Sequence, residues 1–93
     1  MNIHAFDWDE KNEDRIAEHG ISIPEVEEAI LFSKPFYQRA RENKHIAYAV
    51  TEDGRYLFVV FVIKDTARIR VISARDMTGK EKHYYKITKS GRG

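Results

Sequence analysis

The feature that most constrains the fold is an uninterrupted apolar run from Tyr56 to Ile63. Such a run between two turn signals, Glu52–Arg55 and Lys64–Ala67, is typical of a central strand covered on both faces. The preceding segment, His45–Thr51, alternates between large apolar and small or polar side chains, and the following segment, Arg68–Arg75, is an apolar strand that carries arginines. Because turns join the three segments, the sequence predicts an antiparallel meander.

Two helices are expected before this meander. An aspartate can cap a helix over residues 9–19, and Gly20 can end that helix in the left-handed conformation. Ser22 and Glu25 form a capping-box pattern, which begins a second helix that runs to about Phe32. Neither helix can bury its apolar stripe alone, so both are expected to cover one face of the sheet. The other face is then partly open and could hold a long ligand.

The remaining segments complete an α+β plan. Residues 3–8 are expected to form a short strand or an extended lead-in, and residues 36–43 an irregular, basic connection. Another capping-box pattern predicts a last helix over residues 79–87, with a frayed tail after it. The predicted fold is two N-terminal helices packed on a small antiparallel sheet with a C-terminal helix, in a single domain over residues 1–93.

Composition limits the class of protein. The sequence has no cysteine, which excludes a disulfide framework and a thiolate zinc site. No apolar run approaches the roughly 20 residues that a membrane-spanning helix requires, and the N-terminus lacks the basic and then apolar layout of a secretion signal. We therefore expect a cytoplasmic protein that uses oxygen and nitrogen side chains for its chemistry, with no cofactor, metal or membrane partner.

Charge is segregated along the chain although the formal net charge is only +1. Residues 1–33 contain nine acidic and two basic side chains, whereas residues 34–93 contain fourteen basic and six acidic ones. The split indicates two surfaces of opposite sign, of which the basic one can attract a polyanion. The acidic half has an alternative explanation, because helices commonly expose charged faces to water.

The basic half is concentrated around the predicted strand Arg68–Arg75 and the helix after it. Arg75 is expected at the junction of this strand and helix, where functional side chains tend to collect. By simple alternation Arg68 and Arg70 point to the opposite face from Arg75, so the three are not expected to form one site. Arg68 and Arg70 are instead expected to steer a nucleic acid or to bind a protein partner.

Several short motifs follow one another along residues 5–85. They are Phe6–Glu10, His19–Ser22, Pro24–Ala29 and Arg70–Arg75, followed by Glu81 and the pair Tyr84-Tyr85. In this order they resemble the BrnT family of bacterial toxins. The resemblance implies a RelE-like fold and ribonuclease activity, with messenger RNA as one candidate substrate. It also implies neutralisation by a cognate antitoxin, a BrnA-like protein with a ribbon-helix-helix domain, and contact with operator DNA only through the toxin–antitoxin complex.

Cleavage of RNA through its own 2′-hydroxyl requires a proton acceptor, a proton donor and cations that stabilise the phosphorane, but no metal. Arg75 is the first candidate for the phosphate clamp, because a guanidinium presents paired donors to two phosphate oxygens. The alternative role of Arg75 is an ion pair with Glu81.

Arg41 is the second candidate clamp. It precedes a strand face that we expect to be open, and whose small side chains leave room for a nucleotide. That face consists of His45, Ala47, Ala49 and Thr51. The alternative is that Arg39 and Arg41 are ordinary loop charges.

Proton transfer could use His45, His83, Glu81 or a tyrosine. Histidine has an unperturbed pKa of roughly 6.5, so it can act as an acid or a base near neutrality. Glu81 can cap the last helix, act as a general base or pair with an arginine. Tyr84 and Tyr85 point about 100° apart on a helix, so one is expected in the core while the other stacks on a base or donates to a phosphate.

These considerations define two sets of candidates. The catalytic candidates are Arg75, Glu81, His83, Tyr84, Arg41 and His45, and the RNA-binding candidates are Arg39, Arg68, Arg70, Lys80, Lys82 and Tyr85. His19 and Asn12 share the helix stripe of Ile16, which favours a structural histidine over a metal ligand. Two functions remain open: a toxin ribonuclease, or a catalytically inactive binding module that acts with an antitoxin in transcriptional repression.

Overall fold

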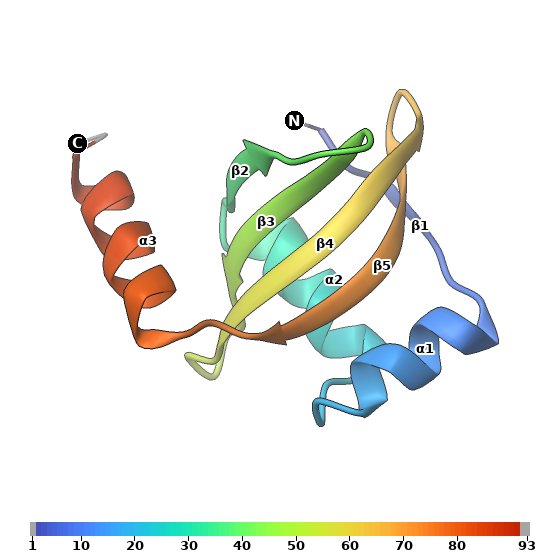
Figure 1. Cartoon of the computed structure of the whole chain (residues 1–93), viewed down its shortest axis with the longest axis horizontal. Helices are drawn as coiled ribbons and strands as arrows, with labels where there is room; N and C mark the ends of the chain where they lie inside the picture. Colours follow the sequence, from blue (N-terminus) through green and yellow to red (C-terminus); the bar gives the residue numbers. More distant parts are fainter. Residues whose placement is uncertain (1, 92–93) are drawn as a thin grey trace.

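The computed structural model describes residues 2–91 and shows an α+β fold, in which three helices accompany one five-stranded sheet (Figure 1). The elements in chain order are β1 Ala5–Asp7, α1 Glu10–Ala17, α2 Ile23–Phe32, β2 Phe36–Arg39, β3 Lys44–Val50, β4 Tyr56–Asp65, β5 Arg68–Asp76 and α3 Gly79–Gly91. The strand order across the sheet is β1-β5-β4-β3-β2. Within the described residues, no helix combines the length and apolar character needed to cross a membrane.

The apolar run forms β4, the central strand of the sheet, as its composition predicts. Leu57, Val59 and Phe61 point to one face, where none of them has exposed surface. The alternate positions from Tyr56 to Val62 are only half-buried on the other face. Strand β4 is thus fully covered on the face of Leu57, Val59 and Phe61 and only partly covered on the other face, although cover on both faces was expected.

Helices α1 and α2 cover that inner face, as expected (Figure 1). Asp9 caps α1 by accepting a hydrogen bond from the backbone of Asn12, and Gly20 ends the turn after it with a φ of 69°. Ser22 and Glu25 form the predicted capping box of α2. The inner core comprises Ile3, Ile16, Ile21, Val26, Ala29, Ile30, Ala47, Ala49, Leu57, Val59, Phe61, Ile69, Val71 and Ala74.

The sheet is mixed, so the expectation of a purely antiparallel sheet is wrong. Strand β1 pairs in parallel with β5, with Ala5 opposite Arg68 and Asp7 opposite Arg70. The three neighbouring pairs from β2 to β5 are antiparallel, as predicted for the meander. The lead-in segment therefore closes the sheet edge beside the arginine strand.

Residues 36–43, expected to be irregular, form strand β2 and a tight turn into β3. Phe36 lies opposite Tyr48 in an antiparallel pair. The backbone N–H of Lys44 donates to the Arg41 carbonyl, and the two residues between them, Glu42 and Asn43, have φ values of 57° and 61°. The hydrogen bond and the two positive φ values are those of a type I′ hairpin turn, which usually contains glycine. Without that glycine the sequence carried no clear hairpin signal.

The strand face of His45, Ala47, Ala49 and Thr51 is the covered face, so the expectation that it is open to a nucleotide is wrong. Ala47 and Ala49 have no exposed surface and belong to the inner core. Helix α2 packs on β3 at this face. The small side chains allow the helix to approach the sheet closely, because protein interiors are filled to high density.

A bulge in β5 overturns the expected orientation of the arginines. Val60 pairs with Ser73 and Phe61 with Val71, which leaves Ile72 as an extra residue in β5. One extra residue reverses the alternation of every side chain beyond it. Arg75 therefore lies on the same outer face of the sheet as Arg68 and Arg70.

Helix α3 packs on the outer face and continues to Gly91, so the predicted helix end at residue 87 is too early. The capping box at its start is present as predicted. Of the expected frayed tail, residues 88–91 are helical, and residues 92–93 lie outside the described residues. The second core that joins α3 to the sheet consists of Tyr48, Met77 and Tyr85, with Phe36, Ile46, Val50, Tyr56 and Phe58 around them.

Candidate functional site

The site is built on a row of three residues that lie side by side on the outer face of β3, β4 and β5. Tyr48 lies opposite Phe58, and Phe58 lies opposite Arg75. The rings of Tyr48 and Phe58 meet edge to face with centroids 5.4 Å apart. The Arg75 guanidinium carbon lies 4.1 Å from the centroid of the Phe58 ring. The guanidinium thus lies over the ring in a cation–π contact.

Arg75 forms a two-pronged ion pair with Glu81. Arg75 Nη1 and Nη2 donate to the two carboxylate oxygens at 2.8 and 2.9 Å, and Nη1 also donates to the Asp76 carbonyl at 3.1 Å. Side-chain exposure is 38% for Arg75 and 20% for Glu81, so solvent reaches the pair. The ion pair proposed as the alternative role of Arg75 is thus present.

Glu81 has a second partner, because it is also the capping residue of α3. The backbone N–H of Thr78 donates to Glu81 Oε1 at 2.9 Å, and the backbone N–H of Glu81 donates to Thr78 Oγ1. The Arg75 hydrogen bond, followed by the Thr78 backbone N–H, lowers the pKa of Glu81, and the same Glu81 contact raises the pKa of Arg75. Both groups are therefore charged at neutral pH.

Two tyrosine rings border this pair. Tyr84 on α3 lies 5.5 Å from Phe36 and 5.6 Å from Tyr48 between ring centroids, and it is 42% exposed. The Tyr48 hydroxyl donates to Gln38 Oε1 at 3.1 Å. Burial, and then the nearby Glu81 carboxylate, raise the pKa of Tyr48. The Tyr48 hydroxyl therefore keeps its proton at neutral pH and can act as a donor.

Arg68 and Arg70 extend the outer face from Arg75 toward β1, where acidic side chains partly neutralise them. Arg68 pairs with Asp65 at 2.9 Å and with Asp7 at 3.5 Å. Arg70 lies 3.7 Å from Asp9, and its Nε is buried with no hydrogen-bond partner among the described residues. These arginines share the face of Arg75, but the pairing leaves them less net positive charge.

The structure does not bring Arg41 or His45 together with Arg75. Arg41 lies in the β2–β3 turn, at the end of the sheet where β5 begins, whereas Arg75 is near the end of β5. The imidazole of His45 stacks on Phe61 on the covered face, with centroids 5.5 Å apart. Arg39 is exposed at the end of β2.

The α3 candidates divide into exposed and buried residues. Lys80, Lys82 and His83 are exposed, and Lys82 Nζ lies 5.7 Å from the centroid of the Tyr56 ring. Tyr85 is only 8% exposed and belongs to the second core. Of the tyrosine pair, Tyr84 is therefore the exposed one, while Tyr85 fills the core.

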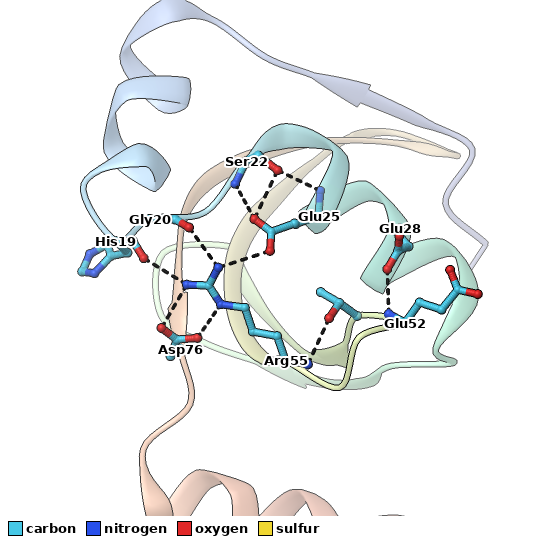
Figure 2. Close-up of polar contacts among 9 residues, drawn as sticks. His19, Gly20, Ser22, Glu25, Glu28, Glu52, Arg55 and Asp76 are labelled. Atoms are coloured by element: carbon cyan, nitrogen blue, oxygen red, sulfur yellow. Dashed lines mark hydrogen bonds and ion pairs between the residues drawn. The ribbon is translucent and has the colours of Figure 1, made fainter.

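Arg55 is a second polar centre that the sequence analysis did not select (Figure 2). Its Nε and Nη2 donate to the Asp76 carboxylate at 2.8 and 3.1 Å, and Nη1 donates to Glu25 at 3.2 Å. Nη1 and Nη2 also donate to the carbonyls of Gly20 and His19 at 2.9 and 3.1 Å. All five N–H donors of the guanidinium are thus used.

These contacts make Arg55 a structural clip that fixes the end of β5. It joins the β3–β4 turn to the α1–α2 turn and to Asp76, the residue after Arg75. The Arg55 contact is the main cause of the lowered pKa of Asp76, whereas the Ser22 backbone N–H is the main cause for Glu25. A clue in the sequence was the position of Arg55 in a hairpin turn. Tyr48 was also missed, because it reads as an ordinary strand residue.

Among residues 2–91, no three histidine, aspartate or glutamate side chains converge in a way that could hold a metal ion. The site itself consists of one guanidinium, one carboxylate and two phenols.

The chain is similar to a known protein family. Residues 8–81 match the model of a family described as "Ribonuclease toxin, BrnT, of type II toxin-antitoxin system". A search of curated proteins finds no match. The matched segment contains Tyr48, Arg75 and Glu81 and ends before Tyr84.

Proposed function

Because this chain belongs to the BrnT family of ribonuclease toxins of type II toxin–antitoxin systems, we propose that it is a metal-independent endoribonuclease. We propose RNA in the cytoplasm as its substrate, with messenger RNA as the first candidate. A RelE-like arrangement of the sheet and α3 belongs to the same proposal. The observation that carries it is the Arg75–Glu81 pair on the outer face, next to Tyr48 and Tyr84.

Substrate binding begins when a phosphate of the RNA replaces the Glu81 carboxylate at Arg75. A phosphodiester offers two oxygens in the geometry that a guanidinium recognises, as the Glu81 carboxylate does. When a phosphate takes the place of the carboxylate, Arg75 stabilises the charge that builds up on the phosphorane. The partial exposure of Arg75 gives the phosphate access.

The same exchange prepares Glu81 to act as a base. Its pKa is lowered chiefly by Arg75, so loss of that contact makes the carboxylate more basic. The Thr78 backbone N–H still holds Glu81 in place. Glu81 can then accept the proton of the 2′-hydroxyl, while the Tyr48 hydroxyl turns from Gln38 Oε1 and donates a hydrogen bond to the phosphate or its proton to the leaving 5′-oxygen. His83, exposed two residues after Glu81, is the alternative proton donor.

The surrounding residues serve to hold the RNA. Tyr84 presents a partly exposed ring on which a base can stack. Lys80 on α3, and Arg68 and Arg70 on β5, supply positive charge on either side of the Arg75 row, whereas Lys82 lies near Tyr56. Most of these contacts reach phosphate and carry no base specificity.

A cognate antitoxin is expected from the family, and we propose a BrnA-like ribbon-helix-helix protein that reaches operator DNA in complex with this chain. One observation favours a second function, that of a catalytically inactive repressor component. Arg75 already makes both hydrogen bonds to the Glu81 carboxylate, as it would in a purely structural ion pair. Activity measurements separate the two functions.

Expression of the chain in a bacterial host tests the proposal. The wild type should arrest growth and degrade RNA, whereas Arg75→Ala should permit growth and leave RNA intact at equal expression. Arg15→Ala is the matched control, because Arg15 is exposed in the last turn of α1 and away from the outer face. Normal growth and intact RNA with soluble wild-type protein would leave only the inactive module, and full toxicity of folded Arg75→Ala would refute the site.

A further inference from the structure

A groove on the opposite side of α3 from the Arg75 row has no role in the proposed catalysis. It is a cavity of about 660 Å³ between the end of α2, the β3–β4 turn and α3. Phe32 and Tyr85 are among its apolar lining residues, together with Tyr56. Phe32 is 79% exposed. Large apolar side chains exposed around a cavity are typical of protein interaction sites.

Carboxylates form one wall of this groove. Glu28 extends from α2 and Glu52 from the β3–β4 turn, and both line the cavity. Figure 2 shows the two side chains near each other, joined by the hydrogen bond from the Glu52 backbone N–H to Glu28 Oε1. That bond uses one Glu28 oxygen only, and neither carboxylate has an ion-pair partner among residues 2–91. Two uncompensated carboxylates beside an apolar floor attract basic side chains and repel phosphate.

Two lysines lie beside the groove, next to its lining residue Tyr56. Lys82 and Lys86 on α3 lie with their ammonium nitrogens 5.7 and 5.5 Å from the centroid of the Tyr56 ring. The groove is therefore acidic on the α2 side and basic on the α3 side. Opposite charges on two sides give a bound segment one preferred orientation, which is a property of protein partners with defined sequence.

We propose that this groove is the docking site of the cognate antitoxin. The bound segment places an apolar side chain against Phe32 and basic side chains against Glu28 and Glu52. The inference rests on the proposed function in one respect only, the identity of the partner. It separates the partner surface from the RNA surface: the antitoxin grips the side of α3 that carries Tyr85, and RNA lies on the side that carries Tyr84.

The test measures binding of the full chain to the small protein encoded next to its gene. Phe32→Ser and the double variant Glu28→Gln/Glu52→Gln should each weaken binding at least tenfold, since truncation of an interface anchor commonly costs that much. Glutamine at position 28 keeps an acceptor for the Glu52 backbone N–H. Ile63→Ser is the matched control, because Ile63 is a large, 44% exposed apolar side chain outside the groove; it should bind like the wild type.

Three other outcomes would overturn the proposed docking site. Wild-type affinity in both groove variants, with folding confirmed by circular dichroism, would overturn the docking site, as would failure of the wild type to bind the neighbouring gene product. Self-association of the chain alone that is abolished by Phe32→Ser would assign the groove to a second copy instead. RNA cleavage measured on the same preparations reports separately on the proposed function, and it should be unchanged in both groove variants.

Discussion

Glu81 and Tyr48 each make more than one contact in the site. Each can therefore lose one contact and still be held in position by another. Glu81 accepts from Arg75 and from the Thr78 backbone at the same time. A phosphate that displaces it from Arg75 leaves it anchored at the helix start. Tyr48 is similarly held, by edge-to-face contacts with Phe58 and Tyr84. The pair and the phenol are thus positioned before a substrate arrives, as electrostatic catalysis requires.

Tyr48→Phe tests the donor role of the hydroxyl. The ring and its packing remain, so stability should change by less than about 1 kcal/mol. RNA cleavage should fall about tenfold or more, because a hydrogen bond to the reacting phosphate is lost. Activity assays and thermal unfolding measure both effects. Tyr37→Phe is the control, since Tyr37 packs against Phe61 on the covered face; equal activity of Tyr48→Phe and wild type would remove Tyr48 from the mechanism.

At the scale of elements, the features that could be predicted from the sequence have local signals. Capping boxes at Ser22 and Thr78 correctly placed the starts of α2 and α3. The features that could not be predicted depend on tertiary context. Strand β2 is followed by a glycine-free type I′ turn, and the bulge at Ile72 has no sequence signature.

The bulge also determined how far the site could be predicted. The ion pair with Glu81 was the alternative to the expected clamp role of Arg75, and the structure contains this pair. Simple alternation placed Arg75 on the wrong face relative to Arg70, because one extra residue reverses the parity. Tyr48 could be recognised only with the register that places it in the row of Phe58 and Arg75.

Arg55 connects the β3–β4 turn to the α1–α2 turn and to Asp76 at the end of β5, and Arg55→Met tests this connection. At pH 7 the substitution should lower the free energy of unfolding by about 2 kcal/mol, a modest figure because its partners are partly exposed. Asp76 and Glu25 have folded-state pKa values below their ordinary values of 3.8 and 4.5. Their contribution is therefore present above about pH 4.5 and is lost as the pH falls through the folded-state values.

The difference in stability between wild type and Arg55→Met should accordingly be largest near neutrality and shrink below about pH 4. Urea unfolding at a series of pH values measures it. Glu25 keeps its bonds from the Ser22 backbone and hydroxyl, so part of the acid sensitivity should remain in the variant. Arg15→Met should show no such pattern, and a difference that does not depend on pH would mean that Arg55 acts by packing alone.

Over the whole molecule, the surfaces follow the charge segregation of the sequence. The acidic half supplies α1, α2 and Glu28 of the groove, and the basic half supplies the Arg75 row and α3. Helix α3 separates the two working surfaces that we propose, with RNA on one side and a protein on the other (Figure 1). Asp7 on β1 and Asp9 at the start of α1, which lie next to Arg68 and Arg70, weaken the positive field at the far edge of the sheet.

The salt dependence of RNA binding tests this division. For single-stranded RNA, each phosphate contact contributes about 0.7 to the slope of log affinity against log salt concentration. Arg75→Ala should reduce the slope by about that amount, and Arg15→Ala should leave it unchanged. Filter binding at several salt concentrations gives both slopes. An equal effect of the two substitutions would show that RNA has no preferred face.

The central claim is that Arg75 directs metal-independent cleavage through the 2′-hydroxyl of RNA. The most direct measurement incubates purified chain with a defined RNA in the presence of a chelator and identifies the new ends. We predict 2′,3′-cyclic phosphate ends for the wild type, at least about a hundredfold slower cleavage for Arg75→Ala, and no cleavage of a strand with a 2′-deoxy residue at the cut site. Three results would contradict the claim: new ends that carry a 5′-phosphate, loss of cleavage in the presence of the chelator, or undiminished cleavage by Arg75→Ala.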